Sequence, residues 1–254
     1  VKQVTIRLAV NEKLWMDHVQ SVVRSMPHLV PVVKGNGYGF RRWNLMPLAG
    51  QLAQEVAVGT IFEARDIPSG IVPIVLTPTL TAPPKNIPLN TVLTVGSPHH
   101  VMALSGAGWT GNVMVKLQSS AMRYGVQRED LAPLLSDIAN ARMTVVGYSI
   151  HPPIDGEMKM HLSDIDSWLN YLDPKIPLYV SHLDTEAYAK LRAENPNRSF
   201  KIRLGTKLWH GDKSMMKLSA DIVDHHPVES GARAGYTQTL INGPVSYTHL
   251  RAHE

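Results

Sequence analysis

The stretch "LVPVVKGNGYG", residues 29–39, joins an unbroken apolar run to a turn with three glycines, and Lys34 lies where the two meet. Such runs are typical of parallel strands that are covered on both faces. A lysine at a strand end can be partly removed from water, which favours the free amine that Schiff-base chemistry needs. A turn that merely links a strand to a helix would have the same pattern.

Runs of the same kind recur along the chain. Stretches with helical spacing separate most of them, most clearly at 128–142 and 184–196, whereas the proline-rich segment 78–90 is expected to lack a full helix. Eight alternating units in about 180 residues predict an α/β fold and fit a (β/α)8 TIM-type barrel better than an open doubly wound sheet. The eight apolar runs are 29–34, 55–60, 71–77, 91–97, 111–117, 143–151, 177–183 and 200–206.

Composition limits the chemistry. The 254 residues, 44% hydrophobic and 18% charged, suffice for one large α/β domain and part of a second. The absence of cysteine excludes disulfides, thiolate metal sites and cysteine nucleophiles, and no metal site is predicted. No apolar run approaches the roughly 18 to 20 residues of a membrane span, and the N-terminus does not resemble a secretory signal. We therefore expect a soluble, cytoplasmic protein without a membrane partner.

The charge balance is mildly basic. The formal net charge is +4, and the 25 Lys and Arg residues are scattered rather than clustered. This distribution favours small anionic ligands over nucleic acid.

Polar residues close many of the apolar runs. In a barrel of this type the catalytic groups lie at the C-terminal ends of the strands. The residues expected there are mostly cationic, which predicts a ligand that carries a phosphate or a carboxylate. Taken singly, each could be a solvated residue of the rim. They are Lys34, Thr77, Lys116, Arg123, His151, His182 and Arg203.

The segment "VVKGNGYG" (32–39) resembles the signature of the alanine racemases, fold-type III enzymes that bind pyridoxal 5′-phosphate on a lysine after the first barrel strand. Further motifs match in order and spacing, and forms such as "MRYG" and "GTKLWHGD" indicate a divergent, alanine-racemase-like branch. These motifs are "KLQSSAMRYGV" (116–126), "GYSIHPP" (147–153), "SHLDTEAY" (181–188), "KIRLGTKLWHGD" (201–212) and "GARAGYTQT" (231–239).

The resemblance implies roles for the cofactor-binding residues. Lys34 would form the Schiff base and act as the base on one face of the substrate, and Tyr38 would hydrogen-bond the cofactor phosphate. Arg203 would meet the pyridine nitrogen and, because a guanidinium keeps its proton, would leave that nitrogen unprotonated and the cofactor a weaker electron sink. The backbone of Gly205 and Thr206 would cradle the phosphate, although a glycine after a strand also suits a simple turn.

Other roles implied by the resemblance concern the substrate and the histidines. Arg123 would bind the substrate, and Lys116 matches a lysine that is often carbamylated, but "LQSSAM" replaces the usual acidic residue and Thr-Gly pair and weakens that expectation. His151 would pack beside the cofactor ring and His182 would hydrogen-bond the tyrosine or arginine shell; either could equally be a core histidine. Thr185 lies one position before the family's phosphate-binding serine and is assigned that cofactor-binding role.

A racemase needs a second base on the opposite face of the substrate, and Tyr236 matches the family's tyrosine. It would deprotonate L-alanine, whereas Lys34 would serve D-alanine. In the family this tyrosine reaches the partner's barrel, which implies a head-to-tail homodimer. Otherwise Tyr236 would be a turn residue of a β-hairpin.

These matches predict a domain order. Residues 1–10 would form a strand that pairs with a C-terminal β domain, 11–215 the barrel, and 216–244 the start of a truncated β domain. Residues 245–254, "VSYTHLRAHE", resemble a translated sequencing-adapter tail. We expect such a fragment to be inactive alone.

Two classes of function remain open at this point. One is a pyridoxal 5′-phosphate-dependent racemase of a small amino acid, alanine first among them. The other is a barrel that binds the cofactor without turnover, in a regulatory role.

Overall fold

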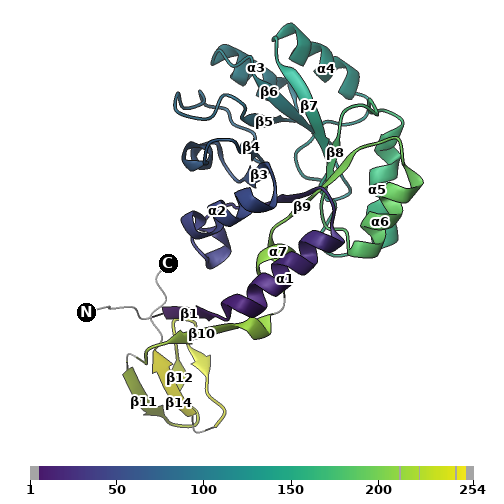
Figure 1. Cartoon of the computed structure of the whole chain (residues 1–254). Coiled ribbons are helices and arrows are strands. Elements are labelled where there is room, and N and C mark those ends of the chain that lie inside the picture. Colours follow the sequence, from purple (N-terminus) through teal and green to yellow (C-terminus); the bar gives the residue numbers. More distant parts are fainter. Residues whose placement is uncertain (1–5, 212, 223, 244, 250–254) are drawn as a thin grey trace. The chain divides into compact units, whose positions relative to one another are not determined.

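The computed structural model describes residues 6–211, 213–222, 224–243 and 245–249 (Figure 1). Eight parallel strands form one sheet in the order β2-β9-β8-β7-β6-β5-β4-β3. All eight predicted runs are strands, and the predicted TIM-type α/β barrel is confirmed. The strands are β2 (Leu29–Pro31), β3 (Glu55–Val58), β4 (Val72–Val75), β5 (Val92–Val95), β6 (Asn112–Lys116), β7 (Thr144–Ser149), β8 (Leu178–Val180) and β9 (Phe200–Leu204).

The first two strands of the sheet in sequence, β2 and β3, close the barrel. Val32 forms a parallel bridge with Ala57, and the Val33 amide donates to the Ala57 carbonyl at 2.8 Å. The edges that an open sheet would leave unpaired are thereby joined.

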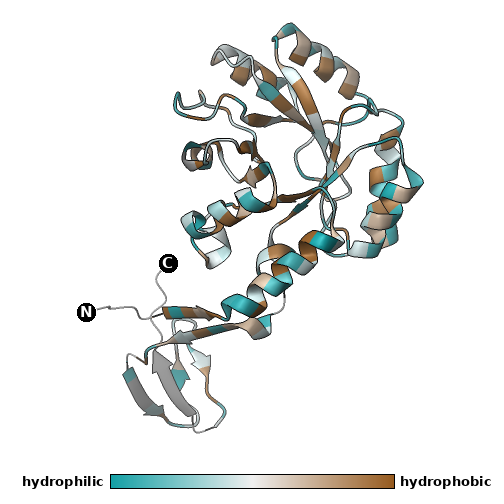
Figure 2. Ribbon diagram, viewed as in Figure 1, coloured by the Kyte–Doolittle hydropathy of each residue, from teal (hydrophilic) through white to brown (hydrophobic). Residues whose placement is uncertain are grey.

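Apolar side chains fill the barrel interior. The runs are unbroken because each strand faces this interior on one side and helices on the other, and Figure 2 shows the strands largely in the hydrophobic colour. The interior cluster consists of Val30, Val32, Ala57, Ile74, Val92, Met114 and Tyr179.

Helices follow most of the barrel strands. The predicted helices at 128–142 and 184–196 are present, with shorter bounds, as α4 and α6. Among the described residues none of the helices is both long and apolar enough to cross a bilayer. The helices are α1 (Glu12–Ser25), α2 (Arg42–Leu52), α3 (Pro98–Gly106), α4 (Leu131–Asn140), α5 (Met158–Leu169), α6 (Thr185–Glu194) and α7 (Thr206–Trp209), with 3-10 turns η1 (Gly37–Gly39), η2 (Ile61–Asp66) and η3 (Lys213–Met215).

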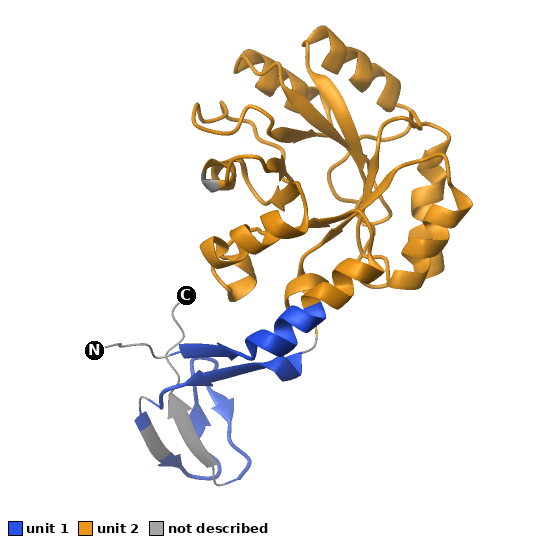
Figure 3. Cartoon of the chain, in the orientation of Figure 1, with its two compact units in different colours: residues 1–18, 212–254 blue, residues 19–211 orange. Residues whose placement is uncertain are grey.

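The chain divides into two compact units, residues 19–211 and residues 1–18 with 212–254 (Figure 3). The second unit is built from antiparallel pairs: β1 (Ile6–Val10) with β10 (Met216–Ala220), β11 (Asp224–Val228) with β14 (Val245–His249), and β12 (Arg233–Ala234) with β13 (Thr239–Leu240). β14 lies in the stretch that resembles an added tail, and residues 250–254 lie outside the described part of the chain.

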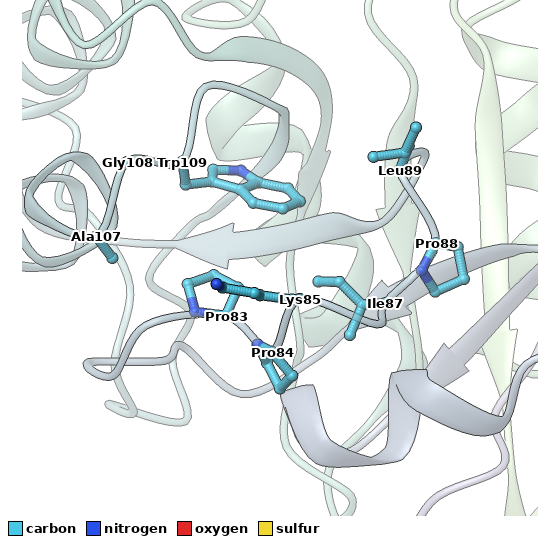
Figure 4. Close-up of a pocket in the computed structure, with 9 residues that line it drawn as sticks. All are labelled: Pro83, Pro84, Lys85, Ile87, Pro88, Leu89, Ala107, Gly108 and Trp109. Atoms are coloured by element: carbon cyan, nitrogen blue, oxygen red, sulfur yellow. The ribbon is translucent and has the colours of Figure 1, made fainter.

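The proline-rich segment between β4 and β5 forms no helix, as the sequence predicts. Its prolines cannot donate backbone hydrogen bonds, so an α-helix over this stretch is disfavoured. The segment instead borders a small cavity of about 190 Å³ beside the Trp109 ring, together with the turn after α3 (Figure 4).

An ion pair spans the strand that closes the barrel. Lys201 of β9 lies 2.7 and 2.8 Å from the two carboxylate oxygens of Glu55 on β3, and β2 lies between these strands in the sheet. The Tyr179 hydroxyl donates to Glu55 at 3.0 Å. The side chains of Lys201 and Glu55 are only 26% and 23% exposed, so solvent screens the pair incompletely.

We expect Lys201→Met to lower the free energy of unfolding by about 1 to 3 kcal/mol, because the Glu55 carboxylate would keep its burial but lose its cation. Urea denaturation measures this loss. Lys190→Met is the matched control, since Lys190 pairs with Glu194 at 3.8 Å on the exposed face of α6, and we expect a loss of less than about 0.5 kcal/mol there. Equal losses in the two variants would contradict a closing role for the Lys201 pair.

Candidate functional site

The C-terminal ends of the barrel strands enclose a cavity of about 560 Å³ within the unit of residues 19–211. Every strand-end residue singled out in the sequence lines it, so the barrel brings together groups that lie up to 169 positions apart (Lys34 to Arg203). The predicted residues in the wall are Lys34, Tyr38, Thr77, Lys116, Arg123, His151, His182, Arg203, Gly205 and Thr206.

Lys34 follows β2 and begins a tight turn. The Gly37 amide donates to the Lys34 carbonyl at 3.1 Å. Gly37 has φ +59°, and a Cβ there would lie 2.8 Å from the Arg42 amide nitrogen, so only glycine fits. The sequence suggested that Lys34 would be partly removed from water; the structure instead leaves it exposed on the cavity wall.

Tyr38 places its hydroxyl directly over Gly205. A Cβ at Gly205 would lie 1.9 Å from that oxygen, so the absence of a side chain there makes the approach possible. The Tyr38 backbone has φ +56° and is held by His210, whose Nε2 lies 2.7 Å from the Tyr38 carbonyl oxygen. Burial raises the pKa of Tyr38, so its hydroxyl keeps the proton that it can donate.

A second anchor fixes the loop that carries Gly205. The indole Nε1 of Trp209, in α7, donates to the Val32 carbonyl at 2.8 Å. Trp209 is fully buried. This bond and the His210 contact join the end of β2 to the segment after β9 at one corner of the cavity.

Two buried basic side chains, Lys116 and Arg203, occupy the cavity floor. Arg203 donates from Nη2 to the Ile150 carbonyl at 2.7 Å, while its Nε and the Nζ of Lys116 have no hydrogen-bond partner among the described residues. Burial, then the charges of Arg203 and Arg123, lower the pKa of Lys116 to about 6, and Asp164 opposes this only weakly. Unpaired buried donors are rare, so these two mark a place where a polar ligand is expected.

Two histidines lie next to each other beside these basic groups, with their ring planes tilted by 54°. The rings of His151 and His182 have centroids 4.4 Å apart, and Ser181 Oγ lies 2.6 Å from His151 Nδ1. Burial first, then the neighbouring cations, lower the pKa of His151 to about 2, and burial also lowers that of His182. Both rings are therefore neutral at physiological pH. The sequence motifs did not single out Ser181 as a site residue, although it directly follows β8 and lines the cavity.

The loop after β6 carries Arg123 and is held in place by side-chain hydrogen bonds. Ser119 Oγ donates to the His151 carbonyl at 2.7 Å, and Trp168 Nε1 donates to the Gln118 carbonyl at 2.9 Å. Asp164 of α5 accepts from both the amide and the hydroxyl of Ser120 at 2.9 Å. Arg123 is thus held in the wall by its neighbours in the chain.

The structure does not bring Thr185 and Tyr236 to this cavity wall. Thr185 is exposed at the first position of α6 and is not among the residues that line the cavity. Tyr236 belongs to the other unit, where it is fully exposed in the turn between β12 and β13.

Comparison with known families agrees with this geometry. The family profile "Alanine racemase, N-terminal domain" matches residues 15–209. The chain belongs to the alanine racemase family. No curated protein matches the chain by sequence.

Solved structures of two alanine racemases and of one histidine racemase share the fold. Alanine racemase from Corynebacterium glutamicum has 20% identity and a TM-score of 0.68, over 89% of this chain and 71% of that one. Alanine racemase from Bacillus anthracis with bound L-Ala-P has 17% identity and a TM-score of 0.69, over 96% and 71%. Histidine racemase from Leuconostoc mesenteroides has 16% identity and a TM-score of 0.64, over 98% and 74%. At these identities the likeness establishes the fold alone.

We expect Gly205→Ala to lower the free energy of unfolding by about 1 to 3 kcal/mol, because the new methyl group would collide with Tyr38. In a double-mutant cycle with Tyr38→Ala, the double variant should lose less than the sum of the single variants. Gly106→Ala is the control, since a Cβ there meets nothing within 4 Å. If the losses in free energy of unfolding measured by urea denaturation are additive, Gly205 and Tyr38 are not sterically coupled.

Lys116 should make stability depend on pH. Between about pH 6 and the ordinary pKa of 10.5, the unfolded chain binds a proton that the folded chain has released, so the free energy of unfolding rises with pH in this window. In urea titrations at pH 7, 8 and 9, Lys116→Met should reduce this rise by about 1 kcal/mol per pH unit. Lys175→Met, at an exposed lysine, should leave the slope unchanged. An unchanged slope in Lys116→Met would mean that Lys116 is charged when folded.

Proposed function

We propose that this chain carries the cofactor-binding barrel of a pyridoxal 5′-phosphate-dependent amino-acid racemase, with alanine as substrate. The observation that carries the proposal is the composition of one cavity wall. A lysine at the end of β2 shares it with four further basic side chains, and no Asp or Glu side chain lines it in the described part of the chain. The five basic residues are Lys34, Lys116, Arg123, Arg203 and Lys207.

The residues present fit the cofactor. The unpartnered Nε of buried Arg203 is a donor suited to a ring nitrogen. Tyr38 and the backbone of Gly205 and Thr206 lie together at one corner, which suits a phosphate group. Lys34 would hold the cofactor covalently through Nζ. A cavity of about 560 Å³ has room for a cofactor and a small amino acid.

Arg203 would limit how strongly the bound cofactor withdraws electrons from the substrate. When bound, the cofactor withdraws electrons from the substrate and makes its α-proton acidic. The Arg203 guanidinium stays protonated at neutral pH, because burial lowers its pKa only to about 10. It can therefore donate to a ring nitrogen but cannot accept from it, which limits electron withdrawal and disfavours side reactions.

Two groups of this chain would move the proton. Lys34 Nζ would take the α-proton of D-alanine on one face, and the Tyr236 hydroxyl that of L-alanine on the other. Because Tyr236 is fully exposed, it is available to a second copy of the chain, which supports a head-to-tail homodimer. Arg123 would bind the substrate carboxylate.

The surroundings of Lys116 suit the carbamate that its family counterpart often carries. A neutral amine is the form that adds carbon dioxide, releasing a proton, and the low pKa of Lys116 keeps it neutral at pH 7. The resulting anion would lie near Arg203 and Arg123, whose charges lower that pKa.

A cofactor-binding barrel without turnover is the second candidate. It is favoured by the position of Thr185, which does not line the cavity wall. Thr185 therefore does not supply the expected hydroxyl contact to the phosphate.

The proposal is tested by adding pyridoxal 5′-phosphate to the chain and recording the absorbance band at the edge of the visible range. We expect the band in the parent and in Lys175→Ala, and its loss by at least about tenfold in Lys34→Ala, because only Lys34 would bind the aldehyde covalently. A band of parental intensity in Lys34→Ala would refute the role of Lys34.

Exchange of the substrate α-proton with deuterium oxide then separates racemase from binder. For a cofactor-loaded, full-length version that carries the β domain in full we expect exchange into both enantiomers of alanine, and Tyr236→Phe should slow L-alanine more than D-alanine, by about a hundredfold or more for loss of a general base. Cofactor binding without exchange of either enantiomer would favour the non-catalytic barrel.

A further inference from the structure

We propose that Glu63 is a positioning residue for Lys34, acting across the seam where β2 and β3 close the barrel. The inference rests on the proposed function, in which Lys34 is the reactive amine. Glu63 lies in η2, the short turn after β3, and it is not itself a wall residue of the cavity.

The Glu63 carboxylate accepts hydrogen bonds from three backbone amides. Oε2 accepts from Gly59 at 2.6 Å and from Thr60 at 3.4 Å, both on its own side of the seam. Oε1 accepts from Gly35 at 3.0 Å, on the other side. Since Gly35 directly follows Lys34, one carboxylate ties the lysine's backbone to the end of β3.

Gly59 makes this approach possible. A Cβ at Gly59 would lie 3.1 Å from Glu63 Oε2 and 3.2 Å from Lys34 Cβ, closer than ordinary contacts. The glycine thus lets the carboxylate and the Lys34 side chain meet at one point of the seam.

The bond to Gly35 goes beyond helix capping. Thr60 and Glu63 form a capping box at the start of η2. This motif needs only two bonds, from the Glu63 amide to the Thr60 hydroxyl and from the Thr60 amide to the Glu63 carboxylate. The second carboxylate oxygen is used across the seam instead. It holds Gly35, which has φ +59°, where the chain leaves the bridge between Val32 and Ala57. Hydrogen bonds to a charged group are stronger than neutral ones, so this one can fix the direction in which Lys34 leaves the strand.

The test is covalent labelling of the folded chain. The protein is treated with limiting pyridoxal 5′-phosphate, reduced with borohydride and digested, and the labelled fraction of each lysine is measured by mass spectrometry. We expect Glu63→Ala to lower the label on Lys34 about tenfold, as for a lost hydrogen bond to a charged group, and to leave Lys175 unchanged. Deuterium exchange of the Gly35 amide in the untreated chain should speed up by a similar factor.

Matched variants separate positioning from folding. Glu186→Gln repeats the charge change in the first turn of α6, away from the seam, and should label like the parent. Thr60→Ala removes the other half of the capping box and should keep the label on Lys34. If Glu63→Ala fails to fold, Glu63→Gln, which keeps one acceptor oxygen, should still lower the label.

Three outcomes would overturn the inference. Parental labelling of Lys34 in a folded Glu63→Ala chain with faster Gly35 exchange would make the bond merely structural. An equal loss in Thr60→Ala would assign the effect to the cap. A parent chain that is not labelled at Lys34 would refute the proposed function itself, and the Gly35 exchange would then still show whether the bond exists.

Discussion

Closure of the parallel sheet between β2 and β3 is the constraint on which the rest of the structure depends. An open sheet would leave Lys34 at one edge, far from the ends of β6 and β7. In the closed barrel β2 pairs with β9 along the sheet and with β3 at the closure, so Lys34 shares the cavity wall with Tyr38 and Gly205 and also with Gly59, which follows β3. The seam is fastened near one end by the Lys201 and Glu55 pair and near the other by the Glu63 carboxylate.

The cavity brings basic side chains together where burial removes them from water. Lys116 and Arg203 are buried beside each other and neutral histidines complete the floor, so burial disfavours the charged form of Lys116 and a bound anion would restore it. The same arrangement that destabilises the folded chain at low pH therefore favours a phosphate or carboxylate ligand. Stability and binding oppose each other at this point, as is common where residues are arranged for function.

The barrel could be predicted from the sequence because each unbroken apolar run indicates a strand that is buried on both faces. The sequence was also sufficient for the strand-end groups, since the C-terminal ends of barrel strands converge. It was insufficient for Ser181 and Glu63, whose contacts cross between loops with no periodic pattern. Lys34 was expected to be partly buried because its strand is apolar, yet the exposure of a strand-end residue is set by the loops around it. The motif match placed Thr185 by spacing alone, whereas Thr185 is exposed at the first position of α6 and does not line the cavity.

The helix-free connection between β4 and β5 affects where this barrel opens locally. Its prolines restrict the unfolded chain and so reduce the entropy lost on folding, but they supply few amide hydrogen bonds. The sector around Trp109 should thus open locally while the neighbouring strands stay paired. Such a segment should tolerate insertions and changes of length better than a connection whose backbone amides are bonded within a helix.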